Sequence, residues 1–521
     1  MTLPIRTFLF CMMAVIFVFA AASDEGPVVP DASPRHIVIV LVDALRADHL
    51  GCYGYTRNTS PFIDTLAADS VLFERAYSQS SFTVESTLSL FSGMYPSSNP
   101  WGGGQYANTN PEVKDLAQLL AAGGYHTAYF STNPTLDYTA LHKSFDEHAF
   151  LAKTFDKKSQ SLKLTEKALN FMKEHTGRST FMYLHYVSPH TPYTPPDEYY
   201  LRFAPEVYPE PLDAIDDVRA HLDTLLAEGF GPGEARFEDL MLRYDAEIAQ
   251  DDDAIKALFE GLKALGTLED TLLVFVADHG EEFLEHGSVE HAWSLFSESI
   301  HVPLLFWMPK RLAPARIATP VALVDLLPSL LELAGLPPAQ HAVDGAPLFQ
   351  RENDAWVPKP KEKPIIAELL NPVRNVVRAV VEGEYLYIAA PKWLTLEERV
   401  SVSQHIADAR SETLRGLRPS PHPWGPLQYE ALFNRKKDPA EKENILEVLP
   451  ELRDRMHDIL NALRERCPDQ VPDPVKIVRI PNVITHDIRM FLEEKGYLKP
   501  ESTPEEQAVE TEETLRSLGY F

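Results

Sequence analysis

The chain has 521 residues, a length that suits one large domain with an appendage better than a single small domain. Hydrophobic residues make up 45% and charged residues 24% of it, which is the composition of a globular protein with a large core. The formal net charge of -28 argues against a nucleic-acid partner, because binding to phosphate backbones requires an excess of Lys and Arg. A small anionic substrate stays compatible with this charge, since a bound cation reverses the field locally.

The first residues have the layout of a secretory signal peptide. Arg6 precedes an apolar run that ends at Phe19, and three alanines follow before Ser23. The run is shorter than the roughly 20 residues that cross a bilayer comfortably, which favours cleavage over retention as an anchor helix. We therefore expect residues 1–22 to be removed and the mature protein to be secreted or periplasmic, with no stable transmembrane segment.

Apolar strands alternate with helical patterns along the next part of the chain. The segment DLAQLLAAGGYHTAYFS predicts a helix, a turn at Gly124 and a strand, and residues 244–266 predict a long amphipathic helix. Further strands are expected at His36–Val42, 179–187, Thr271–Ala277 and 302–308. This alternation predicts an α/β domain over residues 35–355, with a mostly parallel central sheet flanked by helices on both faces.

The alternation weakens after Pro358, where we expect a smaller C-terminal α+β subdomain over residues 360–480. VVRAVVEGEYLYIAA predicts a hairpin, and LPELRDRMHDILNALRER predicts a helix. A helical, acidic tail is expected over residues 481–521. Two Pro-containing stretches, residues 192–232 and 389–426, are expected to be long loops that set specificity.

Polar side chains directly follow two of the predicted strands. Asp43 follows the strand His36–Val42, and Asp278 and His279 follow the strand Thr271–Ala277. Ligands of open parallel sheets bind beyond the carboxyl ends of the strands, so these side chains can converge on a divalent metal such as Ca, Mn or Zn. A cysteine metal site is excluded, because the sequence has no CxxC pair. Taken alone, an Asp after a strand is often a helix N-cap, so the prediction depends on the segments jointly.

Seven segments between His36 and about Leu348 occur in this order: DALRADHLGCYGY, TSPFIDTLAADSVLFERAYS, LFSGMYP, YVSPHTPYTPP, ADHGEEFLEHG, HVPLLFWMP and LVDLLPSLLELAGLP. These segments resemble the sulfatase family of the alkaline phosphatase superfamily, and ALFNRKKDPAEKENI resembles the family's C-terminal segment. The resemblance implies an alkaline phosphatase-like fold. It also implies a metal-dependent hydrolase of sulfuric or phosphoric esters, with a small or glycan-linked ester as substrate.

The resemblance also implies a role for individual residues. Asp43 matches the first metal-binding aspartate of the family, and Asp278 and His279 match the second metal-binding pair. His190, in SPHTPY, matches a histidine that contacts the anionic group of the substrate. His291, in VEHAW, lies where family members place a substrate-binding Lys or His. A purely structural role is the alternative for both of these histidines.

The sequence departs from the family pattern at the nucleophile. Typical sulfatases carry Cys-x-Pro-Ser-Arg ten residues ahead of a Gly, and the Cys is converted to formylglycine. Counting back from Gly93 places Thr83 at the Cys position, with Glu85 in place of the Pro and Thr87 in place of the Arg. Threonine cannot become formylglycine, because its Cβ already bears a methyl group. The family's Gly-Lys-Trp-His segment is replaced by STNPT, and the second Asp of its Asp-Asp pair is Ala44.

These departures leave a threonine mechanism open, as the resemblance to phosphodiesterases and phosphoethanolamine transferases with a Thr nucleophile implies. A Thr83 hydroxyl beside a divalent cation can attack phosphorus or sulfur and form a covalent intermediate. Thr83 would then also be a metal ligand, and His190 and His291 would stabilise charge or protonate the leaving group. A helix N-cap role for Thr83, with Ser81 or Ser86 as the nucleophile, is the alternative.

Two other functions stay open at this point. One is a phosphoryl-group transferase that acts on an envelope glycan or lipid, and the other is a catalytically inactive sulfatase-like binding protein. Two further histidines near the predicted site, His185 and His286, are interpreted as hydrogen-bonded structural residues.

Overall fold

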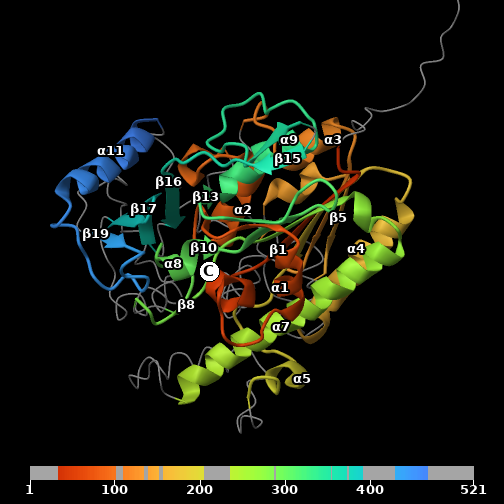
Figure 1. The fold of residues 1–521 in the computed structure, drawn as a ribbon, viewed down its shortest axis with the longest axis horizontal. Helices are drawn as coiled ribbons and strands as arrows, with labels where there is room; N and C mark the ends of the chain where they lie inside the picture. The colour runs from red at the N-terminus through yellow and green to blue at the C-terminus, as the bar shows by residue number, and fades with distance from the viewer. Residues whose placement is uncertain are drawn as a thin grey trace, which may run out of the picture.

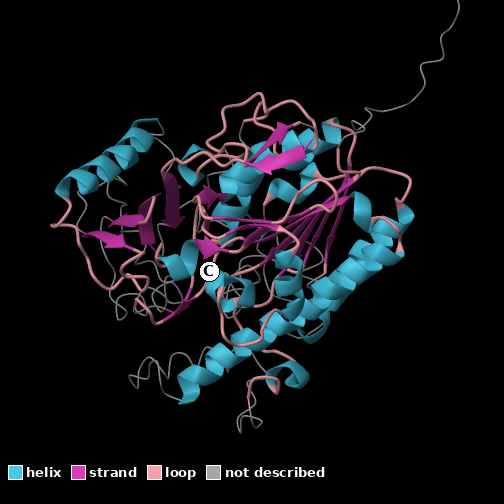
Figure 2. Ribbon diagram, in the orientation of Figure 1, coloured by secondary structure: helices cyan, strands magenta, loops and turns pink. Residues whose placement is uncertain are grey.

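A large sheet forms the centre of the molecule (Figure 1, Figure 2). The computed structural model describes residues 33–100, 110–133, 136, 139–151, 157–204, 235–286, 289–353, 355–371, 375–390 and 429–466. Within these residues the central sheet has eight strands in the order β12-β2-β11-β7-β1-β6-β4-β5, and β11 alone runs antiparallel to its neighbours. The strands are β1 (His36–Val42), β2 (Val71–Phe73), β4 (His126–Ser131), β5 (Glu147–Phe150), β6 (Thr180–Tyr186), β7 (Thr271–Ala277), β11 (Leu304–Trp307) and β12 (Ala315–Ile317).

Helices cover both faces of this sheet (Figure 1). One face carries α1 (Pro61–Ala68), α4 (Lys157–Glu174) and α7 (Ala235–Ala264), and the other carries α2 (Thr83–Ser92), α3 (Leu116–Ala122) and α9 (Leu326–Leu333). Two tyrosines of β6 show the alternation: Tyr186 contacts Thr165 of α4 with 2.9 Å between the hydroxyl oxygens, and the Tyr183 ring lies 5.0 Å from that of Phe91 in α2. Because both faces are covered, β1 is buried at every position and is apolar throughout residues 37–42. The predicted mostly parallel α/β fold is confirmed.

The strand predicted over residues 302–308 is wrong as a single element. Pro303 separates β10 (His301–Val302) from β11, and β10 belongs to a different sheet, β10-β3-β13. Proline has no backbone N–H and therefore interrupts the hydrogen-bond ladder at this point. The long helix predicted from residue 244 begins earlier, at Ala235 of α7.

A second, antiparallel sheet follows in the C-terminal part, with the order β16-β17-β18-β19. Its strands are β16 (Ile365–Asn371), β17 (Asn375–Glu382), β18 (Tyr385–Ala390) and β19 (Tyr429–Asn434), and α11 (Pro450–Arg466) packs against it. The predicted hairpin is formed by β17 and β18, which turn at Gly383 with φ of 56°. The predicted helix is α11. The domain limits at residues 355 and 360 stay predictions.

Smaller elements complete the described part of the chain. They are β3 (Ala76–Tyr77), β8 (Glu282–Phe283), β9 (Val289–Glu290), β13 (Val321–Ala322), β14 (Phe349–Glu352), β15 (Ala355–Pro358), α5 (Asp197–Tyr200), α8 (Ser297–Ile300) and the 3-10 turns Ala47–His49, Gly51–Tyr53, Pro96–Ser98, Ala140–Ser144, Leu268–Asp270 and Leu323–Asp325. The predicted signal peptide (1–22), the tail (481–521) and most of the two predicted loops lie outside the described residues. Among the described helices, none is long and apolar enough to cross a membrane.

Candidate active site

Asp43 and Asp278 lie side by side where two neighbouring parallel strands end. In the register of β1 and β7, Val42 is opposite Ala277, so each Asp is the first residue beyond its strand. The chain turns sharply at Ala44, whose φ is 56°, and the Ala44 N–H donates to Asp278 Oδ1 at 3.2 Å. The structure therefore brings together two carboxylates that are more than 200 positions apart in the sequence.

Each of these two carboxylates has one oxygen that is hydrogen-bonded and one that is not. Asp43 Oδ2 contacts His185 Nε2 at 2.8 Å and accepts a bond from Asn133 Nδ2, whereas Asp278 Oδ1 accepts the N–H groups of Ala44 and His279. Asp43 Oδ1 and Asp278 Oδ2 are buried and have no hydrogen-bond partner among the described residues. Buried carboxylate oxygens without a donor are costly, and a bound cation removes that cost.

The pKa values of the two carboxyl groups are shifted in opposite directions. Burial and the negative charge of Asp43 raise the pKa of Asp278 to about 6. Burial also acts to raise the pKa of Asp43, but the hydrogen bond with His185 and the nearby histidine charges outweigh it, so this pKa lies well below its ordinary value. Two close carboxylates that compete for protons are the arrangement expected at a site built for a positive charge.

His279 and Thr83 face the same two carboxylates. His279 Nε2 lies 3.1 Å from Thr83 Oγ1 and 3.6 Å from both Asp43 Oδ1 and Asp278 Oδ2. His279 Nδ1 lies 2.8 Å from Gly280 O, so the ring proton belongs on Nδ1 and the lone pair of Nε2 faces the carboxylates. We call Asp43, Thr83, Asp278 and His279 the carboxyl-end cluster.

Thr83 differs from the two serines that are its alternatives as nucleophile. Ser81 Oγ donates to the backbone oxygen of Ser294 at 2.7 Å, and Ser86 Oγ donates to the backbone oxygen of Asp278 at 2.6 Å. Both serine hydroxyl hydrogens are therefore engaged by carbonyl groups. The Thr83 hydroxyl, at the first residue of α2, is the one of the three that contacts His279.

His190 and His291 lie beside the carboxyl-end cluster. The His291 ring is 4.4 Å from that of His279 and 4.6 Å from that of His190, measured between centroids. His291 Nδ1 contacts Glu281 Oε1 at 2.9 Å, and His190 Nδ1 contacts Thr191 O at 2.6 Å. Each ring is thus held through Nδ1, an arrangement that suits histidines whose Nε2 acts on a ligand.

Three polar partners of this site are absent from the residues that the sequence singled out for it. Asn133 and His185 both contact Asp43, and Glu281 contacts His291. Asn133 follows the end of β4 and His185 lies near the end of β6, so the strand-end rule used for Asp43 could also have found them. His185 is hydrogen-bonded, as predicted for a structural residue, to Asp43 and to the Tyr183 hydroxyl. The bond to Asp43 also places it against the site.

The other histidine interpreted as structural, His286, is also hydrogen-bonded. Its Nδ1 contacts Glu298 Oε1 at 2.5 Å and its Nε2 contacts the backbone oxygen of Glu441 at 3.1 Å. Its ring stacks on Phe296, with 3.5 Å between the centroids.

Glu85, which stands in place of the family's Pro, turns away from Thr83 toward the C-terminal sheet. Its carboxylate accepts the Ser80 hydroxyl at 2.6 Å and the backbone N–H of Leu370, in β16, at 3.3 Å. Burial raises the pKa of Glu85 to about 7. This departure therefore ties the first turn of α2 to the second sheet.

The carboxyl-end cluster fits a divalent metal ion. Ligand atoms around one such ion are separated by roughly 3 to 4 Å, since each lies about 2.0–2.6 Å from the metal. The distances from His279 Nε2 to Thr83 Oγ1 and to the two partnerless carboxylate oxygens, 3.1 to 3.6 Å, fall in this range. His185 also lies within reach of Asp43 and Asp278, but it contacts the Asp43 oxygen that Asn133 already binds, which suits an outer partner of the carboxylate.

Comparison with known proteins identifies the family of this chain. The family described as Sulfatase matches residues 35–336, which is more than half of the chain. The chain belongs to the sulfatase family. Arylsulfatase K of Bos taurus is 24% identical to this chain over 331 residues, an alignment that covers 54% of this chain and 59% of the relative. The chain thus matches less than two thirds of the length of that relative.

Solved structures share the fold. A protein in complex with its substrate D-glucosamine-2-N,6-O-disulfate superposes on this chain with a TM-score of 0.64 and 17% identity, covering 85% of this chain and 99% of the other. Phosphonate monoester hydrolase of Agrobacterium radiobacter does so with a TM-score of 0.61 and 18% identity, covering 84% and 97%. The predicted alkaline phosphatase-like architecture, with its additional C-terminal sheet, is confirmed.

Proposed function

We propose that this sulfatase-family protein is a metal-dependent hydrolase of sulfuric or phosphoric esters that uses Thr83 as its nucleophile. One observation carries the proposal: Thr83 Oγ1 lies 3.1 Å from His279 Nε2, which itself lies 3.6 Å from the partnerless oxygens of Asp43 and Asp278. A hydroxyl beside two such carboxylates and an imidazole lone pair is placed to act together with a bound cation.

Asp43, Asp278, His279 and Thr83 would hold the metal. A divalent ion such as Ca, Mn or Zn would supply positive charge that neutralises the ester oxygens and lowers the pKa of the Thr83 hydroxyl. His185 and Asn133 would keep the Asp43 carboxylate oriented through their bonds to Oδ2.

The protein's own residues account for the remaining steps. The Thr83 hydroxyl loses its proton to solvent, its oxygen attacks sulfur or phosphorus, and the bond to the ester oxygen breaks as the new bond forms. His190 or His291 donates a proton to the departing ester oxygen, which leaves as an alcohol, and Glu281 orients His291. Water then cleaves the Thr83 ester and releases sulfate or phosphate. The methyl group of Thr83 restricts χ1 and thereby aims the oxygen.

The substrate class is proposed from the family and its structural neighbours. A neighbour bound to a disulfated glucosamine supports a glycan-linked sulfate ester, and the phosphonate monoester hydrolase neighbour supports a phosphorus ester. The absence of formylglycine chemistry at Thr83 makes phosphate esters as suitable as sulfate esters. We further propose that residues 1–22 direct the protein to the periplasm or the medium, where it would meet such substrates.

The test uses purified mature protein with aryl sulfate, phosphate monoester and phosphodiester substrates, each with added Zn, Mn or Ca. Thr83→Ala and Asp278→Asn are expected to lose turnover, whereas Ser81→Ala, a matched loss of a hydroxyl, is expected to keep it. Rapid acid quenching followed by mass spectrometry should find a phosphoryl or sulfuryl group on the peptide that contains Thr83.

Other outcomes would point elsewhere. Equal background rates for the wild-type protein and every variant, on all substrates, would support an inactive binding protein. Turnover that requires an added acceptor alcohol would support a transferase. A modified peptide that contains Ser81 or Ser86 but not Thr83, obtained with a second protease, would assign the nucleophile to a serine.

A further inference from the structure

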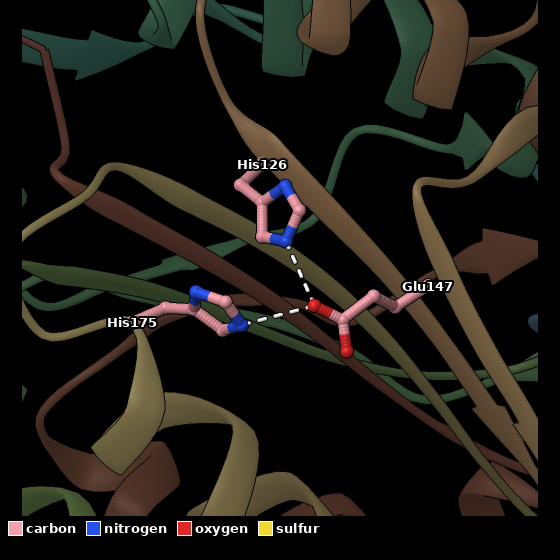
Figure 3. Close-up of side chains that lie close together, drawn as sticks. All are labelled: His126, Glu147 and His175. Atoms are coloured by element: carbon pink, nitrogen blue, oxygen red, sulfur yellow. Dashed lines mark hydrogen bonds and ion pairs between the residues drawn. The ribbon is translucent and has the colours of Figure 1, made fainter.

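A second cluster of side chains that can bind a metal lies at the opposite end of the parallel strands, where β4 and β5 begin. His126 opens β4, Glu147 opens β5, and His175 directly follows the last residue of α4. Figure 3 shows both imidazole rings turned toward the carboxylate of Glu147. The Nε2 atoms of His126 and His175 each lie 2.9 Å from the same oxygen, Glu147 Oε1. We call these three residues the amino-end cluster.

The strand register separates this cluster from the candidate active site. His126 is opposite Thr180 at the start of β6, and Thr180 is opposite His36 at the start of β1. Asp43 comes after the other end of β1, seven residues further on. At about 3.3 Å per residue the two clusters are roughly 20 Å apart along the strands. The amino-end cluster therefore shares no side chain with the candidate active site.

Neighbouring groups hold the His126 ring in a position suited to metal binding. Its Nδ1 lies 3.3 Å from Asp146 Oδ2, and that oxygen is fixed by the Thr127 N–H at 2.9 Å and the Thr127 hydroxyl at 3.1 Å. A carboxylate near Nδ1 favours a proton there, which leaves the Nε2 lone pair facing Glu147. A carboxylate behind a histidine in this way is a frequent outer partner at metal sites.

A buried aromatic ring supports both imidazoles. The His126 ring stacks on Phe171 with 5.7 Å between centroids and an interplanar angle of 14°. The His175 ring lies 4.6 Å from the same Phe171 ring, and the two imidazole centroids are 4.5 Å apart. The pair is thus held in place before any ligand binds, which lowers the entropic cost of binding.

We propose that His126, Glu147 and His175 bind a divalent transition-metal ion, with Zn²⁺ as the first candidate. Two imidazoles and one carboxylate are ligands that zinc and its neighbours prefer, whereas Ca²⁺ and Mg²⁺ prefer oxygen alone. Tetrahedral zinc ligands are roughly 3.3 Å apart, so the two 2.9 Å separations require only a small movement to admit the ion.

Access and the surrounding field also suit a cation. The side chains of His126 and His175 are each 19% exposed and that of Glu147 is 37% exposed, so an ion and a water ligand can enter from solvent. His175 follows the C-terminus of α4, where the helix dipole favours positive charge. The ion joins the edge strand β5 to α4 and thereby stabilises this edge of the sheet.

Zinc titration of the metal-stripped full chain tests the site. The wild-type protein should bind one more Zn²⁺ per chain than the His126→Gln/His175→Gln double variant. Asp278→Asn, which changes the carboxyl-end cluster, should keep this additional Zn²⁺. Co²⁺ gives a second readout, because its visible absorption band from the amino-end cluster should be absent in the double variant alone. His148→Gln, which removes an imidazole from the same strand without touching the cluster, should behave as the wild-type protein.

Glu147→Gln protects the test against a double variant that fails to fold. The amide keeps the size of the side chain but removes its charge, so Zn²⁺ affinity should fall at least about tenfold while the circular dichroism spectrum stays unchanged. The same number of Zn²⁺ ions bound with the same affinity by the wild-type protein, the double variant and Glu147→Gln would overturn the proposal. The three residues would then form a polar network that binds no metal.

Discussion

The two ends of the parallel strands in the central sheet carry polar clusters of similar composition in different surroundings. At the carboxyl ends of β1 and β7, Asp43, Asp278 and His279 are completely buried, and two carboxylate oxygens have no hydrogen-bond partner among the described residues. At the amino ends of β4 and β5, His126 and Glu147 are partly exposed and contact each other directly.

This difference predicts how strongly each cluster depends on an ion. Buried carboxylates without a compensating charge cost free energy, because solvent cannot reach them, and a bound cation would remove this cost. In the partly exposed cluster, water can solvate the side chains when no ion is bound, so the absence of the ion costs little. We therefore expect metal binding to be required at the carboxyl-end cluster and to be a modest stabilising contribution at the amino-end cluster.

The largest effect is expected for the nucleophile. Thr83→Ala should lower kcat about 10³-fold or more, because loss of a nucleophile removes the covalent route entirely. Thr83→Ser keeps the hydroxyl and loses only the methyl group that restricts χ1, so the fall in kcat should be far smaller for this variant. Steady-state kinetics at saturating metal measures both. An alanine variant as active as the serine variant would contradict a role for Thr83 in the chemistry.

Removal of metal should change the stability of the protein mainly through the carboxyl-end cluster and only slightly through the amino-end cluster. A metal in thousandfold excess over its Kd stabilises the folded state by about 4 kcal/mol, so chelation should lower the Tm of the wild-type protein and addition of metal should restore it. In Asp278→Asn most of this response should be lost, because one of the two facing charges is gone. In the His126→Gln/His175→Gln variant most of it should remain. Equal responses in both variants, measured by calorimetry, would remove the distinction between the clusters.

Glu85 provides a test of pH dependence near the carboxyl-end cluster. Burial raises the pKa of Glu85 to about 7 from an ordinary value of 4.5. The folded state therefore binds more protons than the unfolded state in this range, and its stability falls as pH rises through the window from about 4.5 to 7. Compared with Glu85→Gln, the wild-type protein should lose up to about 3 kcal/mol of unfolding free energy across that window. Urea unfolding at a series of pH values measures the difference, and parallel profiles would show that Glu85 does not titrate there.

The smallest effect is expected for activity after loss of the amino-end cluster. His126→Gln/His175→Gln should leave kcat within about twofold of the wild-type value, because sites this far apart usually act independently. The assay is run at a temperature well below the Tm of the variant. A large loss of kcat would show that the amino-end cluster and the carboxyl-end cluster are coupled.

Much of the central sheet could be predicted from the sequence because its strands are buried on both faces. The apolar runs His36–Val42 and Thr271–Ala277 coincide with β1 and β7, and the side chains after them, Asp43 and Asp278, lie together. The 302–308 prediction failed at Pro303, since an apolar run alone does not show which sheet each half joins.

The partners of the site were harder to predict. Asn133 and His185 contact Asp43 because β6 lies next to β1 and β4 lies next to β6. This strand order cannot be predicted from local sequence patterns. Glu281 was overlooked because its contact with His291 depends on how two loops fold over the strand ends.

The sequence by itself determined the strands β1 and β7 and the positions of Asp43, Asp278 and His279 at strand ends, because period and spacing are local properties. The family could be recognised because several segments of the sequence resemble its motifs. Only the tertiary structure decided that the Thr83 hydroxyl faces His279 while the hydroxyls of Ser81 and Ser86 face backbone oxygens. It also decided that His126 and His175 meet at Glu147. Such contacts depend on strand order and helix placement, which bring together residues that no local pattern connects.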